Sequence, residues 1–160
     1  MNLEKVFNFI KEKKGYNVPT LYKLLNDIPL PDDEKTEYIN KMNLYLLKDS
    51  KEPDRIINIL LSSEEFINKL NSNGIYYLLE FSNEPEKIIN LLGNKGIEFI
   101  NNLDKYGINL LLRDSNEPEK IINVLLSTEG FINNLDSDGI DALLKFSKEP
   151  EKIRELINLI

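Results

Sequence analysis

Pairs of carboxylates recur four times in this chain, and theirs is the first chemistry to consider. Each pair consists of a glutamate, a proline and a second acidic residue: Glu52-Pro53-Asp54, Glu84-Pro85-Glu86, Glu117-Pro118-Glu119 and Glu149-Pro150-Glu151. Acid–base catalysis by two carboxyl groups needs two environments that push their pKa values apart. Four near-identical copies offer only one environment. We therefore interpret the acidic residues as helix-start residues that face the positive end of the helix dipole.

The segment of residues 136–141, Asp-Ser-Asp-Gly-Ile-Asp, is the nearest approach to a metal-binding loop. An EF-hand loop alternates its ligands before the glycine and ends on a bidentate glutamate, whereas here Gly139 directly follows the second acid. The chain contains no Cys and no His, which excludes disulfides and thiolate or imidazole ligands. It also lacks a phosphate-binding loop. We predict no catalytic, cofactor-binding or metal site, and therefore no enzyme.

The carboxylate motifs belong to a longer repeat. Residues 50–58 recur as residues 82–90, as residues 115–123 and more loosely as residues 147–155. The four prolines are separated by 32, 33 and 32 residues. Self-similarity with this period is typical of a solenoid, in which each unit buries its apolar face against its neighbours.

Each repeat carries three short apolar patterns with helical spacing. The first is Phe66, Ile67 and Leu70, repeated as Phe99, Ile100 and Leu103 and as Phe131, Ile132 and Leu135. The second is Ile75, Leu78 and Leu79, repeated as Ile108, Leu111 and Leu112 and as Ile140, Leu143 and Leu144. The third follows each proline, as in Ile88, Ile89 and Leu92. No pattern alternates with a period of two, so the sequence predicts an all-α fold.

Glycine and proline mark the helix ends in this reading. Each Ser-x-Glu-Pro stretch predicts a helix start, because serine can cap free N–H groups and proline in the first turn leaves none unpaired. Gly74, Gly107 and Gly139 follow polar triplets and are interpreted as helix-ending residues before the next capped helix. Gly93, Gly96 and Gly130 are expected to break or bend the link into the next Phe-Ile pattern.

These signals predict a right-handed helical-repeat solenoid with a period of 32–33 residues and two to three short helices per unit. We place four repeats at residues 34–63, 64–95, 96–128 and 129–160. Residues 34–48 are expected to form one continuous helix, because the first repeat lacks the glycine turn. Residues 1–33 are interpreted as a degenerate N-terminal cap with helices near 2–14 and 19–26.

The repeat unit resembles TAL-effector-like DNA-binding repeats. It has the same kind of period, and a short helix with an Ile-x-x-Leu-Leu core precedes a loop and a longer helix, over residues 43–160. The resemblance implies DNA binding through inter-helix loops, which would present Phe81-Ser82, Asp114-Ser115 or Phe146-Ser147 to bases. Where that family has a glycine pair, this chain has Asn83-Glu84, Asn116-Glu117 and Lys148-Glu149.

The net charge of the chain favours protein binding over DNA binding. A formal charge of −7 opposes contact with nucleic acid and with anionic membranes. We therefore predict a non-catalytic scaffold for protein–protein interaction, whose partner could be basic, and rank DNA binding second. The N-terminus is charged where a signal peptide would be apolar, and no apolar run is long enough to cross a bilayer. An intracellular protein is expected.

Eight loop residues are the predicted partner contacts. Aromatic and acidic residues alternate at one loop position, so we expect that position to be exposed and the serine beside it to share the contact. The predicted residues are Asp49, Ser50, Phe81, Ser82, Asp114, Ser115, Phe146 and Ser147.

The C-terminal residues are a second predicted contact. Leu156, Ile157, Leu159 and Ile160 crowd the final five positions, and we expect no polar cap there. We expect either that the chain was cut from a longer array or that this end self-associates or packs on another molecule.

Overall fold

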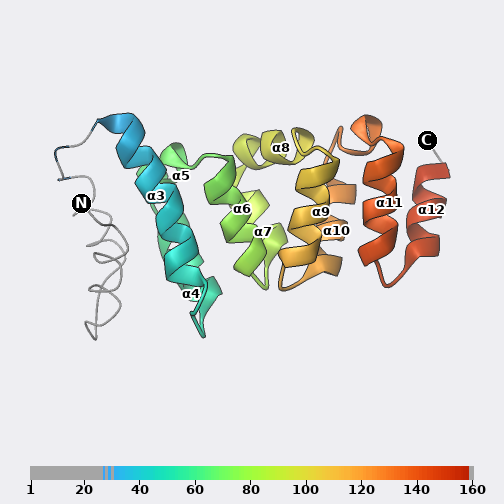
Figure 1. Ribbon diagram of the computed structural model, residues 1–160, viewed down its shortest axis with the longest axis horizontal. Coiled ribbons are helices and arrows are strands. Elements are labelled where there is room, and N and C mark those ends of the chain that lie inside the picture. The colour runs from blue at the N-terminus through green and yellow to red at the C-terminus, as the bar shows by residue number, and fades with distance from the viewer. Residues whose placement is uncertain (1–26, 28, 30, 159–160) are drawn as a thin grey trace. The chain divides into compact units, whose positions relative to one another are not determined.

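The computed structural model describes residues 27, 29 and 31–158, and the prediction of an all-α fold is confirmed over that part of the chain (Figure 1). Its elements are α3 (Asp32–Leu47), α4 (Pro53–Leu61), α5 (Glu64–Lys69), α6 (Ser72–Phe81), α7 (Pro85–Leu92), α8 (Asn94–Asn101), α9 (Lys105–Asp114), α10 (Pro118–Ser127), the 3-10 helix η1 (Ile132–Asn134), α11 (Ser137–Phe146) and α12 (Pro150–Asn158). The two predicted cap helices lie outside the described residues. No described helix is long and apolar enough to cross a membrane.

Four helices begin at the prolines of the repeated motif, as predicted. α4, α7, α10 and α12 each start on the proline. Proline suits this position because an N–H group in the first turn of a helix has no partner within the helix, and proline has no N–H group. The preceding glutamate is the N-cap residue of α4, α7 and α10, but its side chain does not cap the helix. The serine two residues earlier accepts the glutamate's own N–H, so it closes the turn before the helix and does not cap the first helical turn.

The interpretation of Gly74, Gly107 and Gly139 as helix-ending residues is wrong. All three lie in the first turn of a helix, and their N–H groups donate to the side chains of Asn71, Asp104 and Asp136 at 3.0, 2.7 and 2.7 Å. The polar residues therefore cap the helices as predicted, while the glycines serve another purpose.

Close packing explains glycine at these first-turn positions. A Cβ atom at Gly74 would lie 2.8 Å from a methyl carbon of Leu70 and 1.9 Å from Oδ1 of Asn40. At Gly107 and Gly139 the same Cβ would lie 3.1 and 2.9 Å from the leucine four residues earlier. Each leucine ends the Phe-Ile-x-x-Leu pattern, so the glycine lets the chain fold back over it.

The chain divides into two compact units, residues 1–77 and 78–160. In the described part of the first unit, α3 packs against α4 and α5. The expectation of one continuous helix over residues 34–48 is confirmed, because α3 spans Asp32–Leu47 without interruption. Two asparagines, Asn40 and Asn43, are buried on α3 beside the apolar residues Ile39 and Met42.

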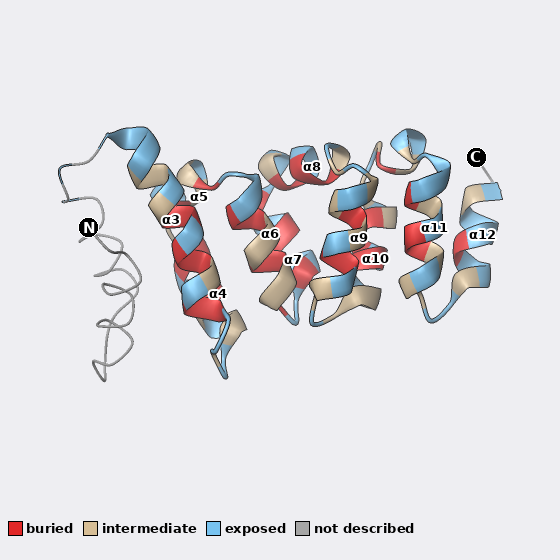
Figure 2. Ribbon diagram, in the orientation of Figure 1, coloured by how far each residue is buried: buried red, intermediate tan, exposed pale blue. Residues whose placement is uncertain are grey.

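In the second unit, helices of equivalent sequence pack against one another. α7 contacts α10, α9 contacts both α10 and α11, and α12 contacts α11. The buried residues recur along these helices (Figure 2). Residues of all three apolar patterns are buried in this unit: Leu78, Leu79, Ile88, Ile89 and Phe99.

The last repeat departs from the others. Where the Phe-Ile pattern predicts a helix, residues 132–134 form only a 3-10 turn. Gly130 precedes it with a φ of 86°, a left-handed conformation that suits glycine, and the chain re-enters helix only at Ser137. Phe131 is nevertheless buried, so the pattern marks the core even where the helix is lost.

Candidate partner-binding surface

The predicted contact residues lie in or beside four equivalent turns, which we name the Ser-Glu turns. They comprise residues 50–52, 82–84, 115–117 and 147–149. The serine Oγ accepts the glutamate N–H at 3.1, 2.8, 3.0 and 2.9 Å respectively. These serine side chains have a structural role in holding the turn.

Exposure differs among the eight predicted residues. Asp49 is exposed and Ser82 is buried, with 1% of its surface accessible. The others are half-buried: Ser50, Phe81, Asp114, Ser115, Phe146 and Ser147. The expectation that the aromatic position would be exposed therefore holds only in part. The Phe146 ring also lies under the Lys145 ammonium, 5.1 Å from the ring centroid.

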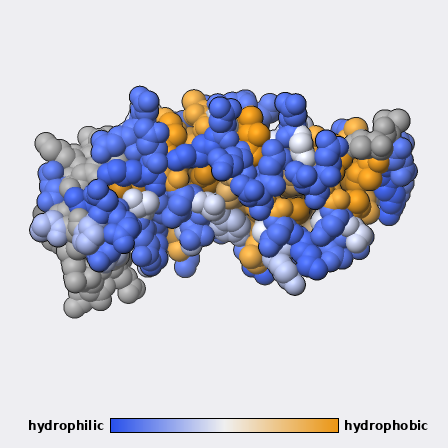
Figure 3. All heavy atoms as spheres, turned by 90° about the horizontal axis from the view of Figure 1, so that it is seen from above, coloured by the Kyte–Doolittle hydropathy of each residue, from blue (hydrophilic) through white to orange (hydrophobic). Residues whose placement is uncertain are grey.

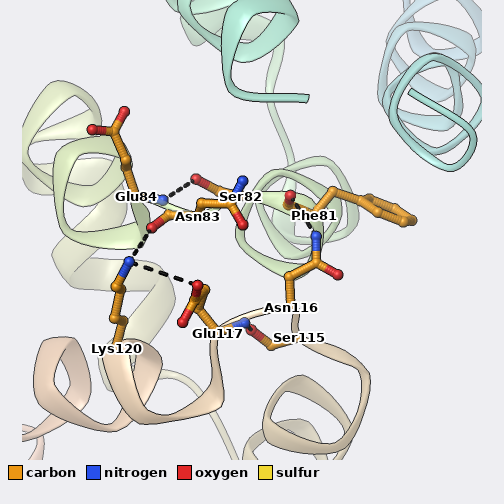
Figure 4. Close-up of polar contacts among 8 residues, drawn as sticks. All are labelled: Phe81, Ser82, Asn83, Glu84, Ser115, Asn116, Glu117 and Lys120. Carbon is orange, nitrogen blue, oxygen red and sulfur yellow. Dashed lines mark hydrogen bonds and ion pairs between the residues drawn. The ribbon is translucent and has the colours of Figure 1, made fainter. Parts of the chain in front are cut away.

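Neighbouring turns of the second unit are joined to each other (Figure 4). Asn116 donates its backbone N–H to Glu80 O and its side-chain amide to Phe81 O, both at 2.9 Å. Lys120 Nζ donates to Asn83 O at 2.9 Å. The turn of residues 115–117 is thus bonded to the C-terminal end of α6, and Lys120 is bonded to the turn of residues 82–84. These bonds restrain both turns.

The next pair of turns is joined by different atoms. Glu119 accepts the Lys148 backbone N–H at 2.8 Å and the Ser147 hydroxyl at 3.3 Å. The second acid of this Glu-Pro-acid motif therefore binds the following turn. This contact gives that carboxylate a structural role.

Each turn also neutralises its own cation. The N-terminal glutamate of the motif pairs with the Lys or Arg three residues later, as in Glu84–Lys87 at 3.6 Å and Glu117–Lys120 at 3.7 Å. The same pairs occur as Glu52–Arg55 and Glu149–Lys152. Exposed pairs of this kind add little stability. The pairs matter for the surface charge instead. Because each of these Lys or Arg side chains lies beside a glutamate, the four cations do not form an uncompensated row of positive charge.

An acidic pair lies at the end of α6 and α9. Burial, and then the neighbouring Asp114 carboxylate, raise the pKa of the Glu80 carboxyl above its ordinary value of 4.5. Asp114 itself is held by the Arg113 guanidinium at 2.6 and 2.8 Å. The arrangement favours the protonated form of Glu80.

Replacing Glu80 with glutamine should therefore stabilise the protein at neutral pH. A carboxyl whose pKa is raised by folding holds its proton more tightly in the folded state, so stability falls as pH rises from about 4.5 through the folded pKa. Glu80→Gln removes this loss. We expect the variant's Tm to exceed that of the wild type at pH 7 and to match it more closely at pH 4. A larger gain at the lower pH would contradict the assignment.

A surface groove of about 540 Å³ lies between α7 and α10. Its lining includes Pro85, Glu86, Asn90 and Leu91 from α7, with Lys120 and Asn123 from α10. The sequence prediction missed these residues. The signal was present, since Asn90 and Asn123 close two copies of the repeated motif, but the pattern alone does not tell which polar positions border a groove.

The described residues include no group of three or more acidic side chains that could hold a metal ion. On the face drawn in Figure 3, hydrophobic atoms form patches between hydrophilic ones. Among residues 78–158, the large apolar side chains left exposed are Leu91, Ile97, Tyr106, Leu110 and Leu156. Of the predicted C-terminal contact, Leu156 is 37% exposed and Ile157 is half-buried, while residues 159–160 lie outside the described part.

Comparisons of the chain with protein-family models, with curated proteins and with solved structures found no match.

Proposed function

We propose that this chain is a non-catalytic helical-repeat scaffold that binds another protein. In this proposal its four repeats form a right-handed solenoid with a period of 32–33 residues, inside the cell. The observation that carries the proposal is the packing of equivalent helices, α7 on α10 and α9 on α11, which leaves a groove between successive repeats. Repeat proteins bind through surfaces of this kind.

Charge supports a basic protein as the partner. Residues 78–160 hold fifteen Asp and Glu residues against nine Lys and Arg residues, so −6 of the formal charge of −7 belongs to them. A surface of one sign attracts an oppositely charged partner over long range and raises the association rate.

DNA binding through the inter-helix loops is the alternative. The TAL-effector-like spacing favours it, and the ion pairs of the Ser-Glu turns oppose it. Lys87 and Lys120 each face a glutamate of their own turn, and Lys120 is further held by Asn83 O. Cations already paired release few counterions when they meet phosphate, so they contribute little affinity.

We accordingly expect the chain to bind double-stranded DNA no more tightly than non-specific proteins do, with a Kd of about 10⁻⁴ to 10⁻⁶ M at physiological salt. Fluorescence anisotropy with labelled duplexes of varied sequence measures this. Sequence-selective binding in the nanomolar range that weakens with added salt would make DNA the function.

The scaffold proposal is tested by recovering and reconstituting a partner. The tagged full chain is used for affinity purification after mild cross-linking in cells of the source organism. Each recovered protein is then purified and titrated against the chain by calorimetry. We expect a saturable complex with a basic protein. Recovery of nucleic acid alone, or turnover of a small molecule by the purified chain, would overturn the proposal.

A further inference from the structure

We propose that the groove between α7 and α10 binds an extended, basic peptide segment of the partner protein. This inference rests on the proposed scaffold function and specifies where the partner binds and what its chemistry is. Three features of the groove support it: its amide side chains, its exposed leucine and its uncompensated acid.

The amides suit a peptide backbone. Asn90 and Asn123 occupy equivalent positions of α7 and α10, are both exposed and both line the groove. Neither carboxamide makes a hydrogen bond to another described residue. Each can donate and accept at once, which is what an extended main chain requires when its N–H and C=O groups alternate in direction. Two such side chains, one from each helix, can hold a strand that crosses the repeat boundary.

The exposed leucine suits one apolar side chain. Leu91 follows Asn90 directly and has 48% of its surface accessible, whereas the preceding core residues Ile88 and Ile89 are buried. Pro85 is buried at the start of α7 and supplies further apolar lining. A small apolar contact flanked by amides gives affinity without the large exposed patch that would favour aggregation.

The acid selects a basic segment. Lys87 and Lys120 are paired with Glu84 and Glu117, so the cations of this region are compensated. Glu86 lines the same groove and is exposed, and no ion pair to another described residue compensates it. The acidic charge of residues 78–160 adds a field of the same sign. Lysine or arginine in the bound segment would meet Glu86.

The test uses a phage-displayed library of random short peptides, selected against the full chain. Enriched peptides are synthesised with a fluorophore, and their Kd is measured by anisotropy. We expect enrichment of peptides that combine Lys or Arg with an apolar residue. Asn90→Ala combined with Asn123→Ala should weaken their binding by about tenfold, since two hydrogen bonds are lost.

Matched variants separate the groove from the rest of the surface. Leu91→Ala and Glu86→Lys should each weaken binding severalfold, whereas Leu110→Ala on α9 and Glu98→Lys on α8, which are exposed and do not line this groove, should leave it unchanged. Circular dichroism confirms that each variant is folded.

The outcomes distinguish the two proposals. If peptides or a reconstituted partner bind with affinity that the groove variants do not alter, the groove assignment is overturned and the scaffold function stands. Enrichment of acidic or uncharged peptides also overturns it. If neither a peptide nor a protein partner binds, both proposals fail.

Discussion

Replacing Leu79 with alanine is expected to lower the free energy of unfolding by about 2–5 kcal/mol, the range for truncating a buried leucine. Leu79 belongs to the second apolar pattern of its repeat and is 1% exposed. In the proposed repeat array each unit is stabilised by its neighbours, so a cavity at this position should weaken the packing of adjacent helices as well as that of α6. Urea denaturation followed by circular dichroism measures the loss.

Leu110→Ala is the matched control for this prediction. Leu110 is also on the second helix of its repeat, but 42% of its surface is accessible. We expect its truncation to cost less than about 1 kcal/mol, as for other surface positions. If Leu79→Ala costs no more than Leu110→Ala, the assignment of the apolar stripe to the core is wrong.

Sequence prediction succeeded where the signal is local. Proline fixes its own φ and lacks an N–H, so Pro53, Pro85, Pro118 and Pro150 predict helix starts without any knowledge of the neighbours. The apolar spacing likewise identifies Phe66 and Phe131 as buried, although only one of them lies in an α-helix.

Prediction failed where a residue's role depends on a second segment. Gly74 follows a polar triplet, which resembles a helix end, but its lack of a side chain serves the close approach of Leu70 and Asn40. The short 3-10 helix after Gly130 was likewise not predicted. Glycine permits the left-handed conformation found at Gly130 but does not require it, and Gly93, which is also left-handed, is followed directly by an α-helix.

The candidate site likewise has one feature that the sequence could predict and one that it could not. Lysine three residues after the motif's glutamate is a helical ion-pair spacing, so the neutralisation of Lys87 and Lys120 could have been predicted from the sequence. The groove could not, because it is bounded by residues 33 positions apart, such as Asn90 and Asn123. Their contribution to one surface depends on how α7 packs against α10.

Asn40→Leu should lower the free energy of unfolding by about 2–4 kcal/mol, because it removes three hydrogen bonds between a buried side chain and part-buried backbone groups. The Asn40 amide donates to Thr36 O at 2.7 Å and Lys69 O at 2.9 Å, and its Oδ1 accepts the Asn71 N–H at 2.9 Å. One side chain thus ties α3 to the end of α5 and to the turn before α6. Leucine has a similar size and can make none of these bonds.

Asn43→Leu, one turn further along α3, should change the free energy of unfolding by less than about 1 kcal/mol or raise it. Asn43 is fully buried. Among the described residues, however, its amide makes only a long bond of 3.4 Å to Gly74 O, and its Oδ1 has no hydrogen-bond partner. An apolar side chain of the same size removes that unsatisfied acceptor, and such replacements are nearly neutral or stabilising. The two variants share helix, burial and chemistry, so a difference in their denaturation midpoints isolates the hydrogen bonds of Asn40. If both variants lose the same free energy of unfolding, the hydrogen bonds of Asn40 do not determine the stability of this unit.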